Sequence, residues 1–229
     1  MDFLKEKCNC MKYSALILLL FSIYSCGQKQ TNSQTNSQDS GKNIQTSISS
    51  DEYLITDTSF GKINKTTTFN DLENMFGKNN IQDTIDYGAE GMDSFIVTKI
   101  NSNTPKEIVI NWQLDKFHKA IGTVDCFQEN APYHTADSLK IGSTLEKLVQ
   151  VNGKKINFYG TGWDYGGIIT SYNNGKFQHS TLYFQLDAKS GASEKVMGDR
   201  ELNTDLPQVK ANFKKLYIAK ISLSLHNSR

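Results

Sequence analysis

The sequence predicts an α+β fold that is mostly β, made of two repeats in which a short helix precedes an antiparallel sheet. Three observations predict it. A helical apolar pattern occurs twice, at residues 68–77 and again at 144–153. Several segments alternate apolar and polar residues, which is typical of half-exposed antiparallel strands. The whole chain contains only three prolines, so little interrupts a sheet.

The first 25 residues have the features of a secretory signal peptide. Lys5, Lys7 and Lys12 precede the apolar run YSALILLLFSIYS at residues 13–25, which is the order of charge and apolar core that such signals share. A helix that crosses a bilayer needs about 20 apolar residues, so this run is too short for a permanent span. Met11 is an alternative start, because a complete signal also follows it.

Residues 26–50 are predicted to form a flexible tether. Gln, Asn, Ser and Thr dominate this segment, and it shows no apolar periodicity. Such a composition cannot bury enough apolar surface to become ordered. Residues 51–229 are then expected to form the α+β domain, with repeat units at about 51–135 and 136–229.

The repeat consists of two amphipathic segments that lie 76 residues apart, as Gly77 and Gly153 do. The aligned pairs are Phe69 with Leu145, Leu72 with Leu148, Met75 with Val151, Gly77 with Gly153, and Lys78 with Lys154. The apolar members recur at helical spacing. Thr68 can cap the first helix at its N-terminus and either Ser143 or Thr144 the second, and the glycines can end them in the left-handed conformation.

Strand signals follow both helices. The predicted strands are 94–100, 107–115, 156–160, 166–180, 180–187 and 215–225. In 107–115, Ile108, Ile110, Trp112 and Leu114 are expected on one face. In 215–225, Tyr217, Ala219, Ile221, Leu223 and Leu225 are expected inward, with Lys220, Ser222 and Ser224 outward. Asn174-Gly175 predicts a hairpin turn.

The charge balance argues against nucleic acid as a partner. The whole chain has 25 basic and 24 acidic residues, and the signal segment contains three and two of them, so 22 of each remain after it. A neutral domain offers no basic field to attract a phosphate backbone.

The end of the apolar run, Ile23-Tyr24-Ser25-Cys26, resembles the lipobox of bacterial lipoproteins. The resemblance implies that Cys26 is acylated and becomes the first residue of the mature chain, which would attach the protein to a lipid bilayer. Two or three acyl chains suffice for stable anchoring. Tyr24 departs from the small residue that is usual at its position.

The second repeat, KIGSTLEKLVQVNGKKINFYG, resembles two related groups. One is the small lipoprotein of the outer-membrane β-barrel assembly machine, and the other is the β-lactamase-inhibitor-like repeat. The resemblance implies helices packed on an antiparallel sheet and a role in binding proteins. The stretch NGKKINFYGTGWDYGG is also similar to uncharacterised lipoproteins of the Bacteroidota. The first repeat departs from the pattern, since Asn64 replaces a glycine and two extra residues intervene.

The candidate binding residues centre on GTGWDYGG, residues 160–167. Its glycines predict a tight bend in which Trp163 and Tyr165 anchor two faces. Alternatively, the loop displays Trp163, Asp164 and Tyr165 to a ligand, together with Tyr159, Tyr172 and Tyr183 as an aromatic face. No lysine followed by Ser or Thr is present to make it a P-loop.

No motif predicts catalysis, a cofactor or a metal. The four histidines, His118, His134, His179 and His226, lack metal-site spacing. Cys126 lies in a strand-like run and is expected to be a buried apolar residue. The alternative is a reactive thiol, which would need a base such as His118 or His134 beside it.

The sequence therefore predicts a membrane-anchored lipoprotein of the cell envelope that acts as a non-catalytic binding module for another protein or an envelope component. Two alternatives stay open: a hydrolase-like envelope enzyme that uses Cys126 or Asp164, and a purely structural envelope component. By resemblance to other lipoproteins, Gly27 in place of Asp after Cys26 favours the outer membrane, and the absence of acidic residues from Gln28-Lys29-Gln30 favours its periplasmic face.

Overall fold

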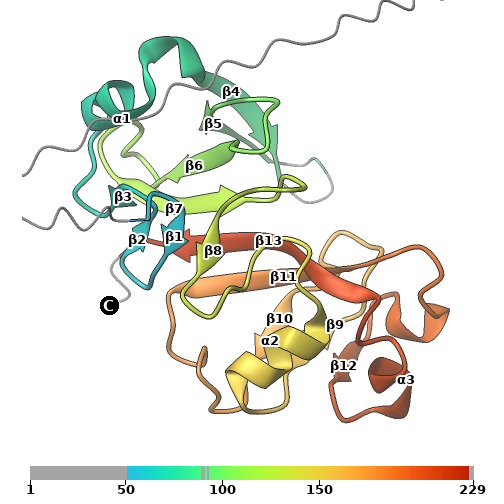
Figure 1. Ribbon diagram of the computed structural model, residues 1–229. Coiled ribbons are helices and arrows are strands. Elements are labelled where there is room, and N and C mark those ends of the chain that lie inside the picture. The colour runs from blue at the N-terminus through green and yellow to red at the C-terminus, as the bar shows by residue number, and fades with distance from the viewer. Residues whose placement is uncertain (1–50, 89–90, 92, 227–229) are drawn as a thin grey trace, which may run out of the picture. The chain divides into compact units, whose positions relative to one another are not determined.

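The computed structural model describes residues 51–88, 91 and 93–226. The predicted signal, the lipidation site Cys26 and the tether lie outside the described residues. The prediction of an α+β, mostly β fold is confirmed, because short helices accompany three sheets (Figure 1). In the described part of the chain, no helix has the length and apolar character needed to cross a membrane.

The first unit contains one helix followed by a meander of four strands. α1 (Phe69–Phe76) leads through the short 3-10 helix η1 (Lys78–Asn80) into β4 (Ile81–Tyr87), β5 (Ser94–Ile100), β6 (Ile108–Trp112) and β7 (Ile121–Cys126). Each strand runs antiparallel to the one before it. A second, small sheet has the order β3-β2-β1-β8. Its strands are β1 (Leu54–Ile55), β2 (Ser59–Phe60), β3 (Ile63–Asn64) and β8 (His134–Thr135).

The second unit repeats this order. α2 (Leu145–Asn152) is followed by β9 (Asn157–Tyr159), β10 (Ile169–Ser171), β11 (Leu182–Ala188) and β13 (Leu216–Ser224). The 76-residue offset of the sequence repeat also relates the strands of the two units. β4 begins at residue 81 and β9 begins at residue 157, and β6 ends at residue 112 while β11 ends at residue 188. Between β11 and β13 the second unit has an insertion made of η3 (Glu194–Val196), β12 (Glu201–Asn203) and α3 (Pro207–Lys210).

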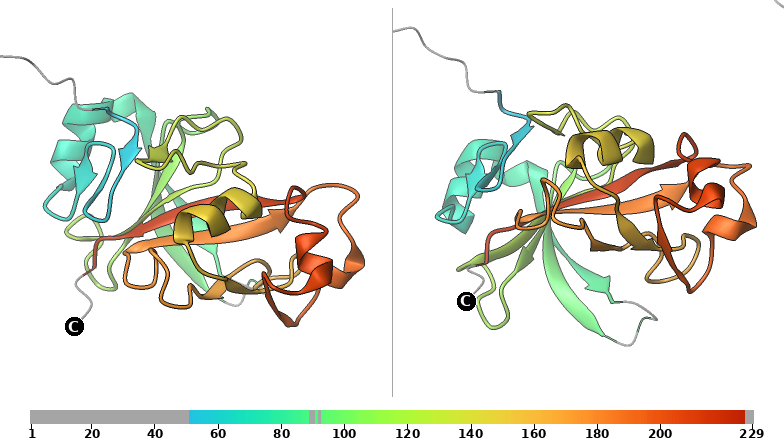
Figure 2. Two further views of the ribbon diagram at one scale, coloured as in Figure 1. Left: turned by 60° about the horizontal axis from the view of Figure 1, so that its bottom comes forward. Right: turned by 90° about the horizontal axis from the view of Figure 1, so that it is seen from below.

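The last strands of the two units pair with each other. β13 runs antiparallel to β7, with Ile221 opposite Cys126. One sheet of order β11-β13-β7-β6-β5-β4 therefore crosses both units. Figure 2 shows α1 and α2 on the same side of this sheet. Leu72 of α1 and Leu148 of α2 are both fully buried in a common core with that sheet face.

Both helices begin as the sequence predicts. The Thr68 hydroxyl accepts a hydrogen bond from the amide of Asp71, whose carboxylate accepts one from the amide of Thr68 in return. This is a capping box. Thr144 accepts from the amide of Lys147 at the start of α2. The two helix ends differ: Gly153 is left-handed, at φ 71° and ψ 3°, whereas Gly77 combines φ 82° with ψ 137°.

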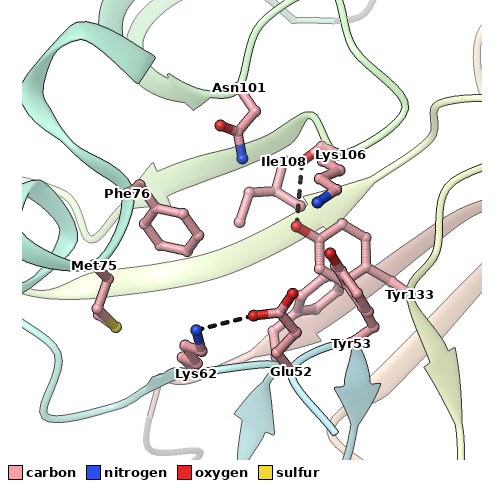
Figure 3. A pocket seen from close by; sticks show the side chains of 10 residues that line it. Glu52, Tyr53, Lys62, Met75, Phe76, Asn101, Lys106, Ile108 and Tyr133 are labelled. Atoms are coloured by element: carbon pink, nitrogen blue, oxygen red, sulfur yellow. Dashed lines mark hydrogen bonds and ion pairs between the residues drawn. The ribbon is translucent and has the colours of Figure 1, made fainter.

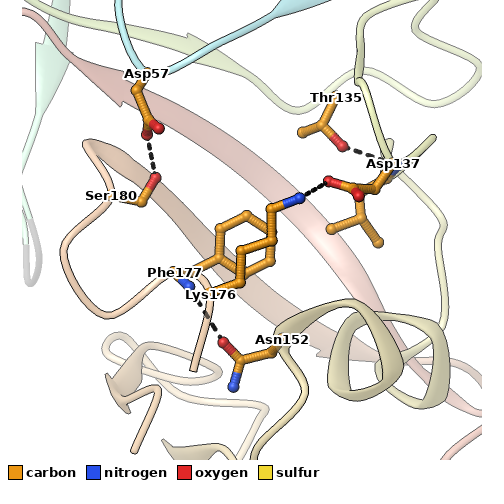
Figure 4. Close-up of polar contacts among 8 residues, drawn as sticks. Asp57, Thr135, Asp137, Asn152, Lys176, Phe177 and Ser180 are labelled. Carbon is orange, nitrogen blue, oxygen red and sulfur yellow. Dashed lines mark hydrogen bonds and ion pairs between the residues drawn. The ribbon is translucent and has the colours of Figure 1, made fainter. Parts of the chain in front are cut away.

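A buried amide attaches the loop after β10 to the end of α2 (Figure 4). The Asn152 side chain donates to the carbonyl oxygen of Tyr172 at 3.0 Å and accepts from the amide of Phe177 at 3.3 Å. Gly175 lies so close that an added Cβ would stand 2.3 Å from Asn152 Nδ2. The loop can therefore follow this path only if residue 175 has no side chain.

Further polar contacts connect the same loop to preceding segments (Figure 4). Asp57, in the turn between β1 and β2, accepts hydrogen bonds from the Ser180 hydroxyl and from the amide of Thr181. Lys176 forms an ion pair with Asp137 at 2.5 Å. The two units are thus in contact beyond the shared sheet.

Two strand predictions were wrong in detail. Leu114 lies beyond the end of β6 and is 89% exposed instead of facing inward. In β13, the residues that face inward before the irregularity are Leu216 and Ile218 rather than Tyr217 and Ala219, because the pairing with β11 shifts between Gln185 and Leu186. A bulge of this kind reverses the alternation of side chains.

The Asn174-Gly175 turn exists, but it does not close a hairpin of two residues. β10 ends at Ser171 and β11 begins at Leu182, so the turn is part of a longer loop. A single bridge between Ile168 and Gln185 connects the two strand regions. Asn152 fills the loop from inside, which is a tertiary contact that the local sequence does not reveal.

Candidate functional site

The predicted aromatic loop, residues 160–167, is a tight bend between β9 and β10. Gly167 has a φ of 73°, and a Cβ added to it would stand 1.8 Å from the carbonyl oxygen of Leu186 in β11. A Cβ on Gly166 would lie 2.8 Å from the carbonyl oxygen of Trp163. No side chain fits in these positions. These two glycines are therefore needed for the bend itself.

Three of the predicted side chains come together on this bend. The Trp163 indole is half-buried, and its Nε1 donates to the carbonyl oxygen of Gly160 at 2.8 Å. Tyr159 and Tyr165 pack edge-on against the indole, with ring centroids at 5.9 and 5.4 Å. Tyr165 is 45% exposed. Trp163 thus anchors the bend, while Tyr165 is displayed on the surface.

The other three predicted residues differ in their exposure. Tyr172 is buried, its ring packs against Phe177, and its hydroxyl accepts a hydrogen bond from the amide of Phe184. The prediction that Tyr172 belongs to an exposed aromatic face was therefore wrong. Burial also raises the pKa of the Tyr172 hydroxyl. Tyr183, by contrast, is 56% exposed on β11. Asp164 is exposed.

A hollow of about 130 Å³ joins the bend to the polar face of the long sheet. Among its lining residues are Ile168, Tyr183, Gln185, Lys220 and Ser222. Gln185 Nε2 donates to the carbonyl oxygen of Gly166 at 2.8 Å, which fixes the bend against β11. We call Tyr165, Ile168 and Tyr183 the loop patch, since these three exposed side chains lie around this region.

Next to the hollow, an ion pair spans the junction of the two units. Lys220 of β13 lies 2.6 Å from the carboxylate of Asp125 in β7, whose side chain is only 9% exposed. Asn111 donates to the same carboxylate oxygen at 3.0 Å. The other oxygen, Oδ1, is buried and has no hydrogen-bond partner among the described residues. Lys220 is thus the main compensation for a buried negative charge.

The largest group of exposed apolar side chains lies elsewhere, on the β4–β5 ribbon, which we define as residues 84–87 and 94–96. β6 pairs only with residues 97–100 of β5, so the ribbon extends beyond the sheet, as Figure 2 shows. Four large side chains on it are exposed: Ile85 by 59%, Tyr87 by 65%, Phe95 by 43% and Ile96 by 52%. Leu114 and Phe117 in the β6–β7 loop are exposed as well.

The sequence analysis missed this surface, although it contained a signal. Phe95, Ile96 and Val97 are consecutive, so a strand through them is apolar on both faces. In a central strand both faces would be covered. Here only Val97 reaches the sheet, and it is fully buried. The exposure of its neighbours depends on how far β6 extends, which local sequence does not show.

A rigid cluster forms the base of the ribbon. The His118 ring is stacked between Phe69 and Phe117, with centroid distances of 3.6 and 3.9 Å. His118 Nε2 lies 3.1 Å from the carboxylate of Asp83, which also accepts from the Thr98 hydroxyl at 2.6 Å. The Asp83 and Thr98 side chains belong to β4 and β5, so this cluster holds the two strands where they leave the sheet.

The structure contradicts one of the enzymatic interpretations. Cys126 is fully buried, and burial raises the pKa of its thiol from 9.0 to about 12, which leaves it protonated at neutral pH. His118 contacts Asp83, and His134 pairs with Asp51 at 3.1 Å, so each of these histidines is placed beside a carboxylate. Among the described residues, no group of three or more His, Cys, Asp or Glu could hold a metal ion.

Comparisons with known proteins add little. No protein-family model and no curated protein sequence matches the chain. Among solved structures, it is similar to the uncharacterized protein yfeY from Escherichia coli, with 12% identity and a TM-score of 0.41 over 73% of this chain and 97% of that chain. Function must therefore be argued from the surface of this chain.

Proposed function

We propose that this chain is a lipid-anchored lipoprotein of the cell envelope whose domain binds another protein through the β4–β5 ribbon. The observation that carries the proposal is the concentration of Ile85, Tyr87, Phe95 and Ile96 on a two-stranded ribbon that leaves the sheet. A two-stranded ribbon is marginally stable in water. Grouped apolar side chains on such a segment are typical of a surface that a partner covers.

The backbone of the ribbon supports a protein as the partner. β4 is the outermost strand of the long sheet, so one row of its amide and carbonyl groups faces away from β5. An extended segment of a partner can pair with such an edge and place its side chains beside the apolar residues of the ribbon. The Asp83–His118 cluster holds the base of the ribbon in place for this contact.

The anchor is proposed from the sequence at Ile23-Tyr24-Ser25-Cys26. Acylated Cys26 would hold the domain at a bilayer through the tether, and we favour the periplasmic face of the outer membrane. Mass spectrometry of the native protein should find Cys26 as an acylated first residue. A bare Cys26, or a signal that is still attached, would contradict the anchor without bearing on the ribbon.

Site-specific photo-crosslinking tests the ribbon. A photoreactive phenylalanine in place of Tyr87, in the full chain in its own host, should give a discrete adduct with one envelope protein. The double change Ile85→Ser and Ile96→Ser should reduce that adduct at least fivefold, with the melting temperature nearly unchanged because both side chains are exposed.

The matched control is Ile168→Ser, which removes an exposed isoleucine from the loop patch. It should leave the adduct at position 87 intact. If crosslinking succeeds from position 183 and fails from position 87, the loop patch is the binding surface and the ribbon proposal is wrong. Equal, diffuse crosslinking from both positions would contradict a specific protein partner.

A further inference from the structure

A second cavity lies in the first unit, at the other end of β5 from the ribbon (Figure 3). Its volume is about 220 Å³. It is enclosed by the β1–β2 segment, the last turn of α1, and the connection from β5 to β6. Pockets for drug-sized ligands measure about 300–1,000 Å³, so this one suits a smaller molecule.

One wall of the cavity is apolar. Phe60 and Ile108 are 1% exposed and form its floor, while Met75 and Phe76 at the end of α1 are partly buried beside them. The Tyr133 ring packs on Phe60 with a centroid distance of 4.9 Å. These side chains would contact an aliphatic or aromatic group by dispersion and burial of apolar area.

The rim opposite this wall carries charge. Lys62 is paired with Glu52 at 2.9 Å, so its charge is already compensated. Lys106 is different: its ammonium forms no ion pair with a carboxylate of the described residues, and Glu52 acts on it only from a longer distance. This ammonium sits 5.3 Å from the centre of the Tyr53 ring. A hydrogen bond with Tyr53 raises the pKa of Lys106 above its ordinary value, so the cation persists at neutral pH.

The hydroxyl of Tyr133 cannot serve as a free donor for a ligand, because it already donates to the carbonyl oxygen of Lys106 at 3.2 Å. This bond fixes the backbone that carries the Lys106 side chain. Figure 3 shows the Asn101 amide directed toward the same space. The cavity thus combines an apolar wall with one cation that lacks an anionic partner and one amide.

We propose that this cavity binds a small molecule or chain end in which an apolar group ends in a carboxylate, with the carboxylate at Lys106 and the apolar group against Phe60, Met75, Phe76 and Ile108. The ligand could be a free aliphatic carboxylate or the C-terminal residue of a peptide, which share this chemistry. The site is separate from the ribbon and does not depend on the function proposed for it.

The Met75 methyl group provides a direct readout. The chain contains five methionines, so the full chain labelled with ¹³C at the methionine methyl groups has few signals. Met75→Leu identifies the signal of the cavity, and Met197 in the second unit serves as an internal control. Hexanoate, and a short peptide ending in leucine with a free carboxylate, are the probes. Hexanol and the C-terminal amide of the same peptide serve as controls, because they lack the carboxylate charge.

We expect a saturable shift of the Met75 signal with hexanoate, with the peptide carboxylate, or with both, and no shift of Met197. Whichever probe binds more tightly identifies the source of the carboxylate. Hexanol and the peptide amide should bind at least tenfold more weakly, because they lose a charge-assisted contact with Lys106.

Lys106→Gln should weaken binding of the charged probe at least tenfold and leave hexanol unaffected. Lys119→Gln, a change at an exposed lysine outside the cavity, should have no effect. The proposal is overturned if neither carboxylate shifts Met75 at 10 mM, if hexanol binds as well as hexanoate, or if Lys106→Gln keeps full affinity. Phe76→Ala, which removes part of the apolar wall, must also weaken both hexanoate and hexanol.

Discussion

At the scale of single residues, burial decides which of the predicted side chains can act. Tyr172 and Cys126 are of the types that bind or react, yet both are enclosed in the core, and burial raises the pKa of each. Desolvation disfavours the charged form of such groups. Tyr165 and Tyr183 remain exposed. Of the residues predicted to bind or react, Tyr172 and Cys126 thus belong to the core, and Tyr165 and Tyr183 belong to the surface.

The Cys126 thiol should be inert in the folded protein. In native conditions at pH 8, the number of thiols that react with a disulfide reagent should be the same in the parent chain and in Cys126→Ala. In denaturant the parent chain should show one more reactive thiol than Cys126→Ala does. A fast extra thiol in the native parent would show that Cys126 is accessible and would reopen the hydrolase interpretation.

The same pKa shift predicts a loss of stability in alkali. The folded state holds the Cys126 proton more tightly than the unfolded state does, since the pKa rises from 9.0 to about 12. The stability is complete below pH 9 and falls by about 1.4 kcal/mol per pH unit as the pH rises toward 12. Urea unfolding at pH 8 and pH 10.5 should show a larger loss for the parent than for Cys126→Ala.

Gly175 and Asn152 give a prediction about packing. Gly175→Ala would place a methyl group 2.3 Å from Asn152 Nδ2 and displace a buried amide that holds the loop. We expect a loss of about 2 kcal/mol in the free energy of unfolding. Gly88→Ala is the control, because a Cβ added to Gly88 would meet no atom of the described residues closer than 3.6 Å, and this change should alter the free energy of unfolding little. Equal effects of the two changes would contradict the packing argument.

At the scale of elements, the two helices show how far local sequence determines structure. Each has a threonine N-cap, an apolar stripe and a glycine end, and these signals predicted both helices at the places where they occur. The ribbon shows the opposite case. Its strands were only partly recognised from alternation, since β4 was not among the predicted strands, and its exposure follows from the short length of β6.

The helix caps can be compared directly. Thr68→Ala and Thr144→Ala each remove a side-chain acceptor at a helix N-terminus and should cost about 1 kcal/mol. Two bonds to residue 68 lower the pKa of the Asp71 carboxyl: the larger effect comes from the backbone amide and the smaller from the Thr68 hydroxyl. The first change removes only the hydroxyl bond, because the amide of residue 68 remains, and the second change removes neither. Because its pKa is lowered in the folded state, the Asp71 carboxyl stabilises the fold above about pH 3.8. This stabilisation is lost as the pH falls below that value.

Thermal unfolding at pH 7 and pH 3 tests this difference. The parent chain should lose slightly more stability on acidification than Thr68→Ala does, because the variant holds the Asp71 carboxylate through the amide of residue 68 alone. Thr144→Ala should respond to acid as the parent does. The same acid response in all three proteins would show that the bond from the Thr68 hydroxyl to the Asp71 carboxylate contributes nothing in solution.

At the scale of the described domain, the two units depend on the pairing of β7 with β13. The Lys220–Asp125 pair lies at this seam through Asp125 Oδ2, and Asp125 Oδ1 has no hydrogen-bond partner among the described residues. Lys220→Met should therefore cost about 2 kcal/mol, because a nearly buried carboxylate is left without its cation. Lys189→Met, at an exposed position of the same unit, is the control.

The double change Asp125→Asn with Lys220→Met separates charge from packing. It should recover part of the stability lost in Lys220→Met, because the isolated charge is gone. Chemical unfolding measures all of the variants. If Lys220→Met is no less stable than the control, or if the double variant is less stable still, the ion pair is not what compensates Asp125.

Local sequence accounts for the helices, the repeat with its 76-residue offset, the glycine bend and the mostly β composition, because caps, periodicity and steric limits act within a few residues. Long-range packing sets the pairing of β7 with β13, the register shift in β13, the burial of Tyr172 and the exposure of the ribbon. It also decided that Lys106 meets Phe76 and Met75 around one cavity. These outcomes depend on contacts between segments far apart in the chain, and no local pattern specifies which partner each surface will meet.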